Sequence, residues 1–294
     1  MARTLILPAP ELRFVIVHYH VMKNAGTTIV SILEREFGEN FYDIHRESAS
    51  DVIGPEELAA FLLESSGVRA VTSHHIRYPL PKVPSMVLFD CCFIRDPLDR
   101  LESLYTFLKT TGDESVMGRL AGTHSLAGFL NGLLEDHPHQ VCNAQTNLLA
   151  NSGRFTRPPD VEDLDRAIRV IQKCALPGLV DRFDESLTVA EYFLKPAFPN
   201  LRLHHRPHNV SRSMAMPLAE RHHRLRSHCG PALFRRLRKA NELDCRLYLA
   251  ARRELERRIA STPSFSLRLA DFRRRCSADA NTFAQLSAIS SVSV

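Results

Sequence analysis

The amino-acid sequence predicts an α/β fold in which a mainly parallel sheet has helices on both faces and is followed by a helical C-terminal region. Short apolar runs rich in β-branched residues alternate with segments whose apolar residues recur at helical spacing. Two of these runs lead through a turn directly into a helix, which is typical of parallel strands buried between helices. From about Pro217 onward the chain has helical periodicity and many arginines.

The first half of the chain contains three predicted strands. Residues 14–17 form an apolar run that is followed by a Gly-Thr-Thr turn and a helix with one apolar face. Residues 68–73 form the second strand. The third strand, residues 86–94, leads into a helix for which Asp96 is the predicted N-cap and Pro97 the first residue.

The second half continues the alternation and then becomes helical. We expect a helix over residues 161–171, a strand over residues 176–180 and a helix over residues 184–194. No internal repeat or interdomain linker stands out, so we expect one domain over residues 1–276. Residues 277–294 are rich in Ser and Ala with little periodicity and are predicted to form a flexible tail.

The composition limits the function classes only weakly. The 294 residues are 44% hydrophobic and 24% charged, and the formal net charge of +5 permits an anionic nucleotide or a polyanionic partner without requiring either. The N-terminal apolar stretch is interrupted by Pro8 and Pro10 and is too short for a secretion signal, so we expect a cytoplasmic protein with no membrane span. Seven cysteines without CxxC spacing indicate neither a disulfide framework nor a zinc site.

The segment between the first predicted strand and its helix has the composition of an anion-binding loop. Such a loop lies at the carboxyl end of a strand and the amino end of a helix, where backbone N–H groups favour anions. Small residues let these groups approach phosphate oxygens, a lysine adds charge, and two threonines add hydroxyl donors. The candidate binding residues are Lys23, Asn24, Ala25, Gly26, Thr27 and Thr28.

The alternative for this segment is an ordinary strand-to-helix turn with a threonine N-cap and a solvated lysine. The Walker A pattern of NTPases is absent because Lys23 precedes Gly26 instead of following it. This order disfavours a kinase or NTPase.

A second candidate anion site follows the strand of residues 86–94. Arg95 ends that strand and Ser103 lies two turns into the next helix, so both can reach one anion. An arginine fork and a serine hydroxyl are donors that suit a nucleotide 3′-phosphate. The alternative is an ion pair between Arg95 and Asp96 at the strand end, with Ser103 an ordinary helix residue that has no binding role.

Two adjacent histidines, His74 and His75, directly follow the strand of residues 68–73 and are candidates for a general base. They would lie on the sheet edge where a nucleotide binds in such folds. The alternative is that both are ordinary polar residues and the base lies elsewhere. His18 and His20 beside the loop are the reserve candidates, although strand alternation more simply makes them packing residues.

These segments resemble the sulfotransferases that use 3′-phosphoadenosine 5′-phosphosulfate (PAPS), in the group that includes heparan sulfate 2-O-sulfotransferase and many bacterial relatives. Residues 22–28 resemble the 5′-phosphosulfate loop P-K-[TN]-[AG]-G-[ST]-[ST], with Met22 in place of proline. Residues 95–103 match the 3′-phosphate motif R-[DN]-P-x-x-R-x-x-S, and His74 aligns with the histidine of the G-H segment. The segments 143–149, 178–187 and 241–248 resemble other parts of these enzymes.

The resemblance implies a P-loop-type fold and an enzyme that moves a sulfuryl group from PAPS to an acceptor hydroxyl. Lys23 and its loop would hold the phosphosulfate, Arg95 and Ser103 the 3′-phosphate, and His74 would be the general base. Lys23 would also act in catalysis by meeting the charge on the leaving phosphate. No metal would be required.

The acceptor and the partners are less defined. The acceptor would be a carbohydrate or glycoconjugate, or else a lipid or small metabolite, and we expect no nucleic-acid partner. The alternatives are a kinase with a similar loop and a non-catalytic polyanion-binding protein. The basic segment at residues 204–208 is interpreted as a solvated or acceptor-facing loop, because no carboxylate or cysteine stands at the spacing that the alternative, a metal site, would need. The clusters at residues 235–239 and 252–258 are interpreted as the solvated sides of helices, and a polyanion-binding surface is the sharper alternative.

Overall fold

The centre of the protein is a five-stranded parallel sheet. The computed structural model describes residues 12–48, 50–205 and 216–290. Within them the strand order is β2-β3-β1-β4-β5, and each neighbouring pair is parallel. The strands are β1 (Arg13–Tyr19), β2 (Phe41–Asp43), β3 (Ala70–Ser73), β4 (Met86–Ile94) and β5 (Leu176–Leu179).

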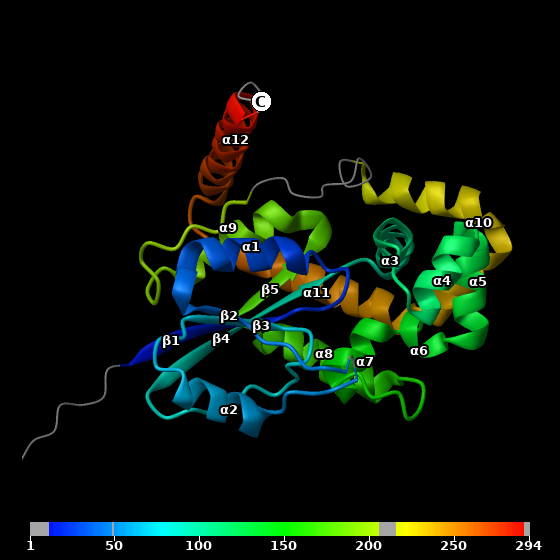
Figure 1. Cartoon of the computed structure of the whole chain (residues 1–294), viewed down its shortest axis with the longest axis horizontal. Coiled ribbons are helices and arrows are strands. Elements are labelled where there is room, and N and C mark those ends of the chain that lie inside the picture. The colour runs from blue at the N-terminus through cyan, green and yellow to red at the C-terminus, as the bar shows by residue number, and fades with distance from the viewer. Residues whose placement is uncertain (1–11, 49, 206–215, 291–294) are drawn as a thin grey trace, which may run out of the picture.

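The helices form two layers over the sheet and a third group beside it (Figure 1). One layer contains α2 (Pro55–Glu64), α7 (Ala144–Asn151), α8 (Val161–Lys173) and α11 (Glu242–Ala260). The other contains α1 (Gly26–Phe37), α9 (Phe183–Leu194) and α12 (Phe265–Ser290). The third group consists of α3 (Pro97–Thr111), α4 (Val116–Thr123), α5 (Leu126–Asp136), α6 (Pro138–Val141) and α10 (Leu218–Ala240). The predicted α/β fold with helices on both faces is therefore confirmed.

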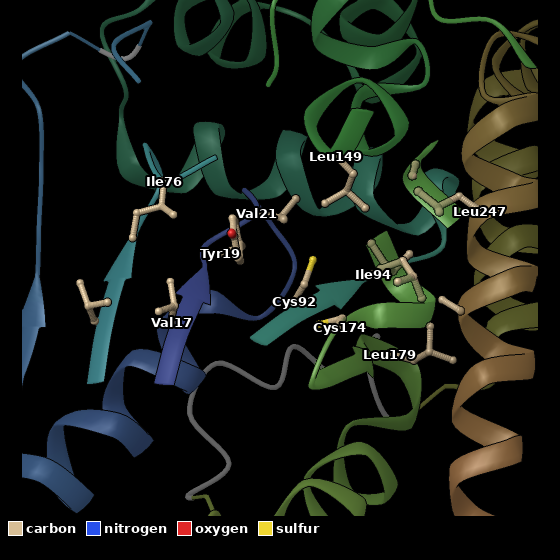
Figure 2. Packing of buried hydrophobic residues seen from close by; sticks show 14 of the residues in the cluster. Val17, Tyr19, Val21, Ile76, Cys92, Ile94, Leu149, Cys174, Leu179 and Leu247 are labelled. Atoms are coloured by element: carbon tan, nitrogen blue, oxygen red, sulfur yellow. The ribbon is translucent and has the colours of Figure 1, made fainter. Parts of the chain in front are cut away.

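The two faces of the sheet are apolar because successive strand residues point to opposite sides. In β1, Val17 and Tyr19 enter the core that α8 and α11 cover, whereas Ile16 enters the core beneath α1. Figure 2 shows the first of these cores, where Cys92 of β4 and Leu179 of β5 lie in the same cluster. A strand buried on both faces reads as a continuous apolar run, which explains why β1 and β4 are recognisable in the sequence.

The connections that follow the two central strands diverge. The chain leaves β1 through α1 toward β2 on one side of the sheet, whereas it leaves β4 through α3 to α8 toward β5 on the other. Neighbouring parallel strands with diverging connections leave a crevice at their carboxyl ends, where ligands bind in open α/β sheets. His20, His74 and Arg95 each directly follow a strand at this edge.

The C-terminal part of the described chain is helical, as predicted. Helix α12 runs to Ser290, so the segment predicted as a tail from residue 277 begins inside this helix, and residues 291–294 lie outside the described residues. In Figure 1, α12 extends away from the sheet. Within the described part of the chain, no helix combines the length and hydropathy that crossing a bilayer requires.

Candidate functional site

The backbone of the loop between β1 and α1 is shaped for an anion. Lys23 and Ala25 both have left-handed conformations, with φ of 66° and 63°, and Ala25 is the N-cap of α1 without a side-chain cap. Among the described residues, the N–H groups of Gly26 and Thr27 have no acceptor, as is usual in the first turn of a helix. These donors lie at the positive end of the helix dipole, so the loop can bind a phosphate or sulfate group.

Asn24 anchors this loop from behind. Its buried side-chain nitrogen donates to the carbonyl oxygen of Phe93 and to Oε1 of Gln145, both at 2.7 Å. Its backbone N–H donates to the carbonyl oxygen of Val21 at 3.1 Å. Since the side-chain amide and the backbone N–H both donate inside the protein, Asn24 positions the loop. Its predicted contact with a bound anion stays a prediction.

The side chain of Lys23 reaches across to α3. Its Nζ lies 3.9 Å from the centroid of the Phe107 ring, a cation–π contact. Burial, together with the charge of Arg95, lowers the pKa of Lys23 to about 8. Among the described residues no carboxylate pairs with this ammonium group. An anion in the loop would give the partly desolvated cation its counter-charge.

Hydrogen bonds of its side chain hold Arg95 in place at the end of β4. Its Nε donates to Oδ2 of Asp99 at 2.6 Å, and its Nη1 donates to the carbonyl oxygen of Lys23 at 2.9 Å. Asp99 also pairs with Arg221 of α10 at 2.6 Å, so two buried guanidinium groups share one buried carboxylate. The guanidinium of Arg95 therefore lies beside the loop that contains Lys23. Asp96 is the N-cap of α3, as predicted, and accepts from two backbone N–H groups.

The remaining predicted donors lie around these groups. Ser103 is half-buried and lies one turn before Phe107 on α3, on the face that Lys23 approaches. Thr27 is exposed and Thr28 half-buried in the first turn of α1. The structure thus brings the two predicted anion-binding segments into contact through Lys23.

His74 presents a proton acceptor at the same edge of the sheet. Its Nδ1 lies 2.6 Å from the carbonyl oxygen of His20, and because a carbonyl can only accept, Nδ1 carries the proton and Nε2 is the acceptor. The ring stacks on that of His20 with centroids 3.7 Å apart. Burial lowers the pKa of His74 below its ordinary 6.5, although the hydrogen bond to His20 and the charge of Asp43 act in the opposite direction. His74 is therefore neutral at about pH 7.

The other candidate histidines are more enclosed. His75 is buried, and its Nδ1 donates to the carbonyl oxygen of Asp51 at 2.9 Å. Burial lowers the pKa of His18 well below its ordinary value and, together with the charge of His74, that of His20 to about 3. The ring of His20 packs against Gly26, since a Cβ atom built on Gly26 would lie 1.9 Å from it. His18 and His20 therefore pack the site, as strand alternation predicts.

Two residues that the sequence left without a role connect both loops to the C-terminal helices. Oε1 of Gln145 accepts from Asn24 and from the backbone N–H of Arg95, the latter at 3.0 Å, and its amide nitrogen donates to the carbonyl oxygen of Arg95 at 2.9 Å. Asp244 is fully buried and accepts from the backbone N–H of Gln145 at 3.0 Å. It also accepts from the N–H and the hydroxyl of Thr146, each at 2.7 Å. The resemblance marked both segments, but local sequence patterns cannot show a contact between residues this far apart in the chain.

Many arginines of the predicted basic clusters form ion pairs. Arg252 pairs with Glu256 at 3.0 Å, and Glu254 pairs with Arg257 and Arg258, each at 2.7 Å. In the cluster at residues 204–208, His205 contacts Asp184 at 2.9 Å. Residues 206–208 lie outside the described residues. The described surface of α11 therefore carries charges of both signs.

Comparison with known proteins leaves the family open. No protein-family model matches the chain. A protein of Archaeoglobus fulgidus, described only as an uncharacterized protein, is 24% identical over 241 residues, which cover 80% of this chain and 95% of that protein. The chain is therefore similar over most of its length to a protein whose description names no activity.

Proposed function

We propose that the protein is a sulfotransferase that transfers a sulfuryl group from PAPS to the hydroxyl of an acceptor. One observation supports this proposal: a loop with the backbone geometry of an anion site, the buried side chain of Arg95 and an exposed histidine, His74, lie together at the carboxyl ends of β1, β3 and β4. PAPS has two anionic groups on one nucleotide, and its reaction needs a base but no metal. The arrangement offers one binding element for each anionic group.

The donor would be held by both anion-binding elements. The N–H groups of Gly26 and Thr27 and the ammonium of Lys23 would bind the phosphosulfate, while Arg95 and Ser103 would bind the 3′-phosphate. The rigid placement of Arg95 means that little side-chain entropy is lost when it binds. Because only a 3′-phosphorylated nucleotide engages both elements, this pairing would also select the donor.

His74 would activate the acceptor. The acceptor oxygen attacks sulfur, its proton passes to Nε2 of His74, and the bond between sulfur and the bridging phosphate oxygen breaks with its electron pair on the phosphate. The products are the sulfate ester and 3′-phosphoadenosine 5′-phosphate (PAP). Lys23 lies at the loop where the negative charge on the leaving phosphate develops, so it would stabilise the transition state more than the bound donor.

The charge distribution argues against a general polyanion-binding protein. The paired arginines of α11 leave a surface of mixed sign, whereas the guanidinium groups of Arg95 and Arg221 are buried at the sheet edge. A buried charge of this kind suits a small anion that enters a crevice. A long polyanion would instead require an exposed basic face.

The proposal is tested by comparing nucleotides that differ in one phosphate. Calorimetric titration should show that PAP binds at least about tenfold more tightly than AMP, which lacks the 3′-phosphate, and more tightly than ATP. The Arg95→Lys variant, which keeps a charge beside Asp99 but loses the planar fork, should lose most of this preference. Thr110 is an exposed residue of α3, the helix that follows Arg95, and provides the control. Thr110→Ala should leave the affinities for PAP and AMP unchanged. Equal affinity for PAP and AMP in the wild-type protein would refute the proposal.

A further inference from the structure

A small pocket opens next to His74 and His20. Its walls include the side chains of His74, Arg77, Tyr19 and Leu148. Because His74 lines it, a molecule in this pocket would lie beside the proposed base. The pocket is distinct from the phosphate-binding loop, whose residues do not line it.

Arg77 brings an unneutralised charge to this pocket. Its guanidinium donates only to backbone carbonyl oxygens, those of His74 at 2.5 Å, Ile76 at 2.9 Å and Ser152 at 2.9 Å. Among the described residues, no carboxylate forms an ion pair with it. Burial lowers the pKa of Arg77 without making it neutral. A partly buried cation that lacks a counter-ion is costly unless an anion approaches it.

Tyr19 adds a second unused donor. The residue is only 4% exposed, and its hydroxyl has no hydrogen-bond partner among the described residues. Its ring stacks face to face on that of Tyr78, with centroids 3.9 Å apart and an interplanar angle of 3°. Tyr78 donates to Asp90 at 3.0 Å, which holds the pair in place. Figure 2 shows Tyr19 at the end of β1 in the apolar cluster.

A buried hydroxyl without a partner is costly, and native structures usually satisfy such groups with protein, water or ligand. The stacking fixes the Tyr19 ring, so the partner must come to it. Arg77 and Tyr19 line the same pocket, so both can contribute donors to one small group bound there. Leu148 and Ile76 supply apolar surface around them.

We propose that this pocket is an acceptor subsite for a carboxylate or similar anionic group, so that the acceptor is a hydroxy acid bound by Arg77 and Tyr19 with its hydroxyl at His74. The inference rests on the proposed sulfotransferase function, because it assigns the second substrate of that reaction. Arg77 follows His74 by three residues, and its hydrogen bond to the His74 carbonyl ties the anion-binding group to the base. A neutral alcohol would leave both donors unsatisfied.

The test uses two acceptors that differ only in charge, 4-(hydroxymethyl)benzoate and 4-(hydroxymethyl)benzamide. Binding of each to the full-length protein is measured by calorimetry with PAP present, and turnover with PAPS is measured by mass spectrometry. We expect the acid to bind at least about tenfold more tightly than the amide. Arg77→Gln should abolish this preference, and Tyr19→Phe should reduce it several-fold while it keeps the stacked ring.

Control variants separate the subsite from folding and from general charge effects. Lys82→Gln removes an exposed cation near the same segment and should leave the acid preference unchanged. Equal binding of acid and amide to the wild-type protein would overturn the inference, as would an acid preference that survives both Arg77→Gln and Tyr19→Phe. If the protein binds PAP but does not prefer the acid, the subsite is refuted and the donor assignment stands. If it prefers the acid through Arg77 but does not bind PAP, the donor assignment is refuted and the anion subsite stands.

Discussion

The adjacent residues His74 and His75 have different surroundings although they are neighbours in the sequence. Both donate from Nδ1 to a backbone carbonyl oxygen, so both have the same tautomer when neutral. His74 is exposed at the edge of the sheet, however, whereas His75 is buried against Asp51. The sequence places both histidines after a strand, but only the turn of the chain beyond Ser73 determines which one faces outward.

His74→Ala should lower turnover by about 10²–10⁴-fold while PAP binding stays nearly unchanged, because the substitution removes a positioned base. The wild-type rate should fall on the acid side of a pKa below 6.5, since burial lowers the pKa of His74 and a protonated imidazole cannot accept a proton. The variant should lack this acid limb in a pH–rate profile.

His75→Ala is the matched control for this prediction. It should cost stability through the lost hydrogen bond to Asp51 but leave the pH–rate profile intact. If His75→Ala removed the acid limb and His74→Ala did not, the assignment of the base would be reversed. Full activity of both variants would move the base to another residue.

The lowered pKa of Lys23 predicts that kcat/KM also depends on pH on the alkaline side. Its pKa of about 8 means that the free enzyme loses this charge as the pH rises through about 8, so kcat/KM for PAPS should fall there. Lys23→Arg, which stays charged, should shift this limb to higher pH, and Lys23→Ala should lower turnover more than PAP affinity. Lys109→Ala on the exposed side of α3 is the control. A flat alkaline profile in the wild type would place Lys23 outside the donor site.

At the scale of elements, the sequence predicts the helices and strands that are marked by a pattern of neighbouring residues. The continuous apolar runs of β1 and β4 and the cap of α3 by Asp96 are recognisable because burial on both faces and capping each have a short-range pattern. The edge strand β2 has only three residues, and its pairing with β3 depends on a partner distant in sequence. The helices between Val116 and Asn151 lack a comparable pattern of strand, turn and helix and were not predicted.

Helix α10 joins the proposed 3′-phosphate element through contacts that no local pattern shows. Arg221 pairs with Asp99, and Nε2 of His222 lies 2.8 Å from Oδ1 of Asp96. The hydrogen bond to Asp96 is the main cause that raises the pKa of His222 above its ordinary 6.5. The contact therefore strengthens when His222 is protonated.

This contact predicts a pH-dependent contribution to stability. Because the folded-state pKa of His222 is raised, its stabilisation is complete below the unfolded pKa and is lost as the pH rises through the folded pKa. His222→Gln should therefore destabilise the protein more at about pH 5.5 than at about pH 8.5, by no more than about 1 kcal/mol because the side chain is partly exposed. Urea unfolding at both pH values measures the difference. The neighbouring His223 is exposed, so His223→Gln is the control variant in the same measurement.

At the scale of the whole molecule, the buried carboxylate of Asp244 links α11 to the sheet edge. It accepts from Gln145 and Thr146 of α7, and Gln145 in turn bonds to Asn24 in the loop after β1 and to Arg95 after β4. Both proposed donor-binding segments therefore depend on one chain of hydrogen bonds. The sequence indicates candidate binding residues by their chemistry. It cannot show the hydrogen bonds that support them, because the residues that form these bonds come together only in the folded chain.

Asp244→Asn tests this link across the molecule. The amide cannot accept at both oxygen positions, so donors on α7 lose a charged acceptor in the core, and we expect the free energy of unfolding to fall by at least about 2 kcal/mol. Because Gln145 would no longer be fixed, PAP affinity should also fall although Asp244 lies outside the proposed nucleotide site.

Asp271→Asn is the control for this prediction. It removes a carboxylate paired with Arg275 on the surface of α12, so the free energy of unfolding should fall by less than about 1 kcal/mol with no change in PAP affinity. Urea unfolding and PAP titration of both variants measure the two effects. If Asp244→Asn lowered stability but PAP bound as tightly as to the wild type, the hydrogen-bond chain would support the fold without positioning the donor-binding segments.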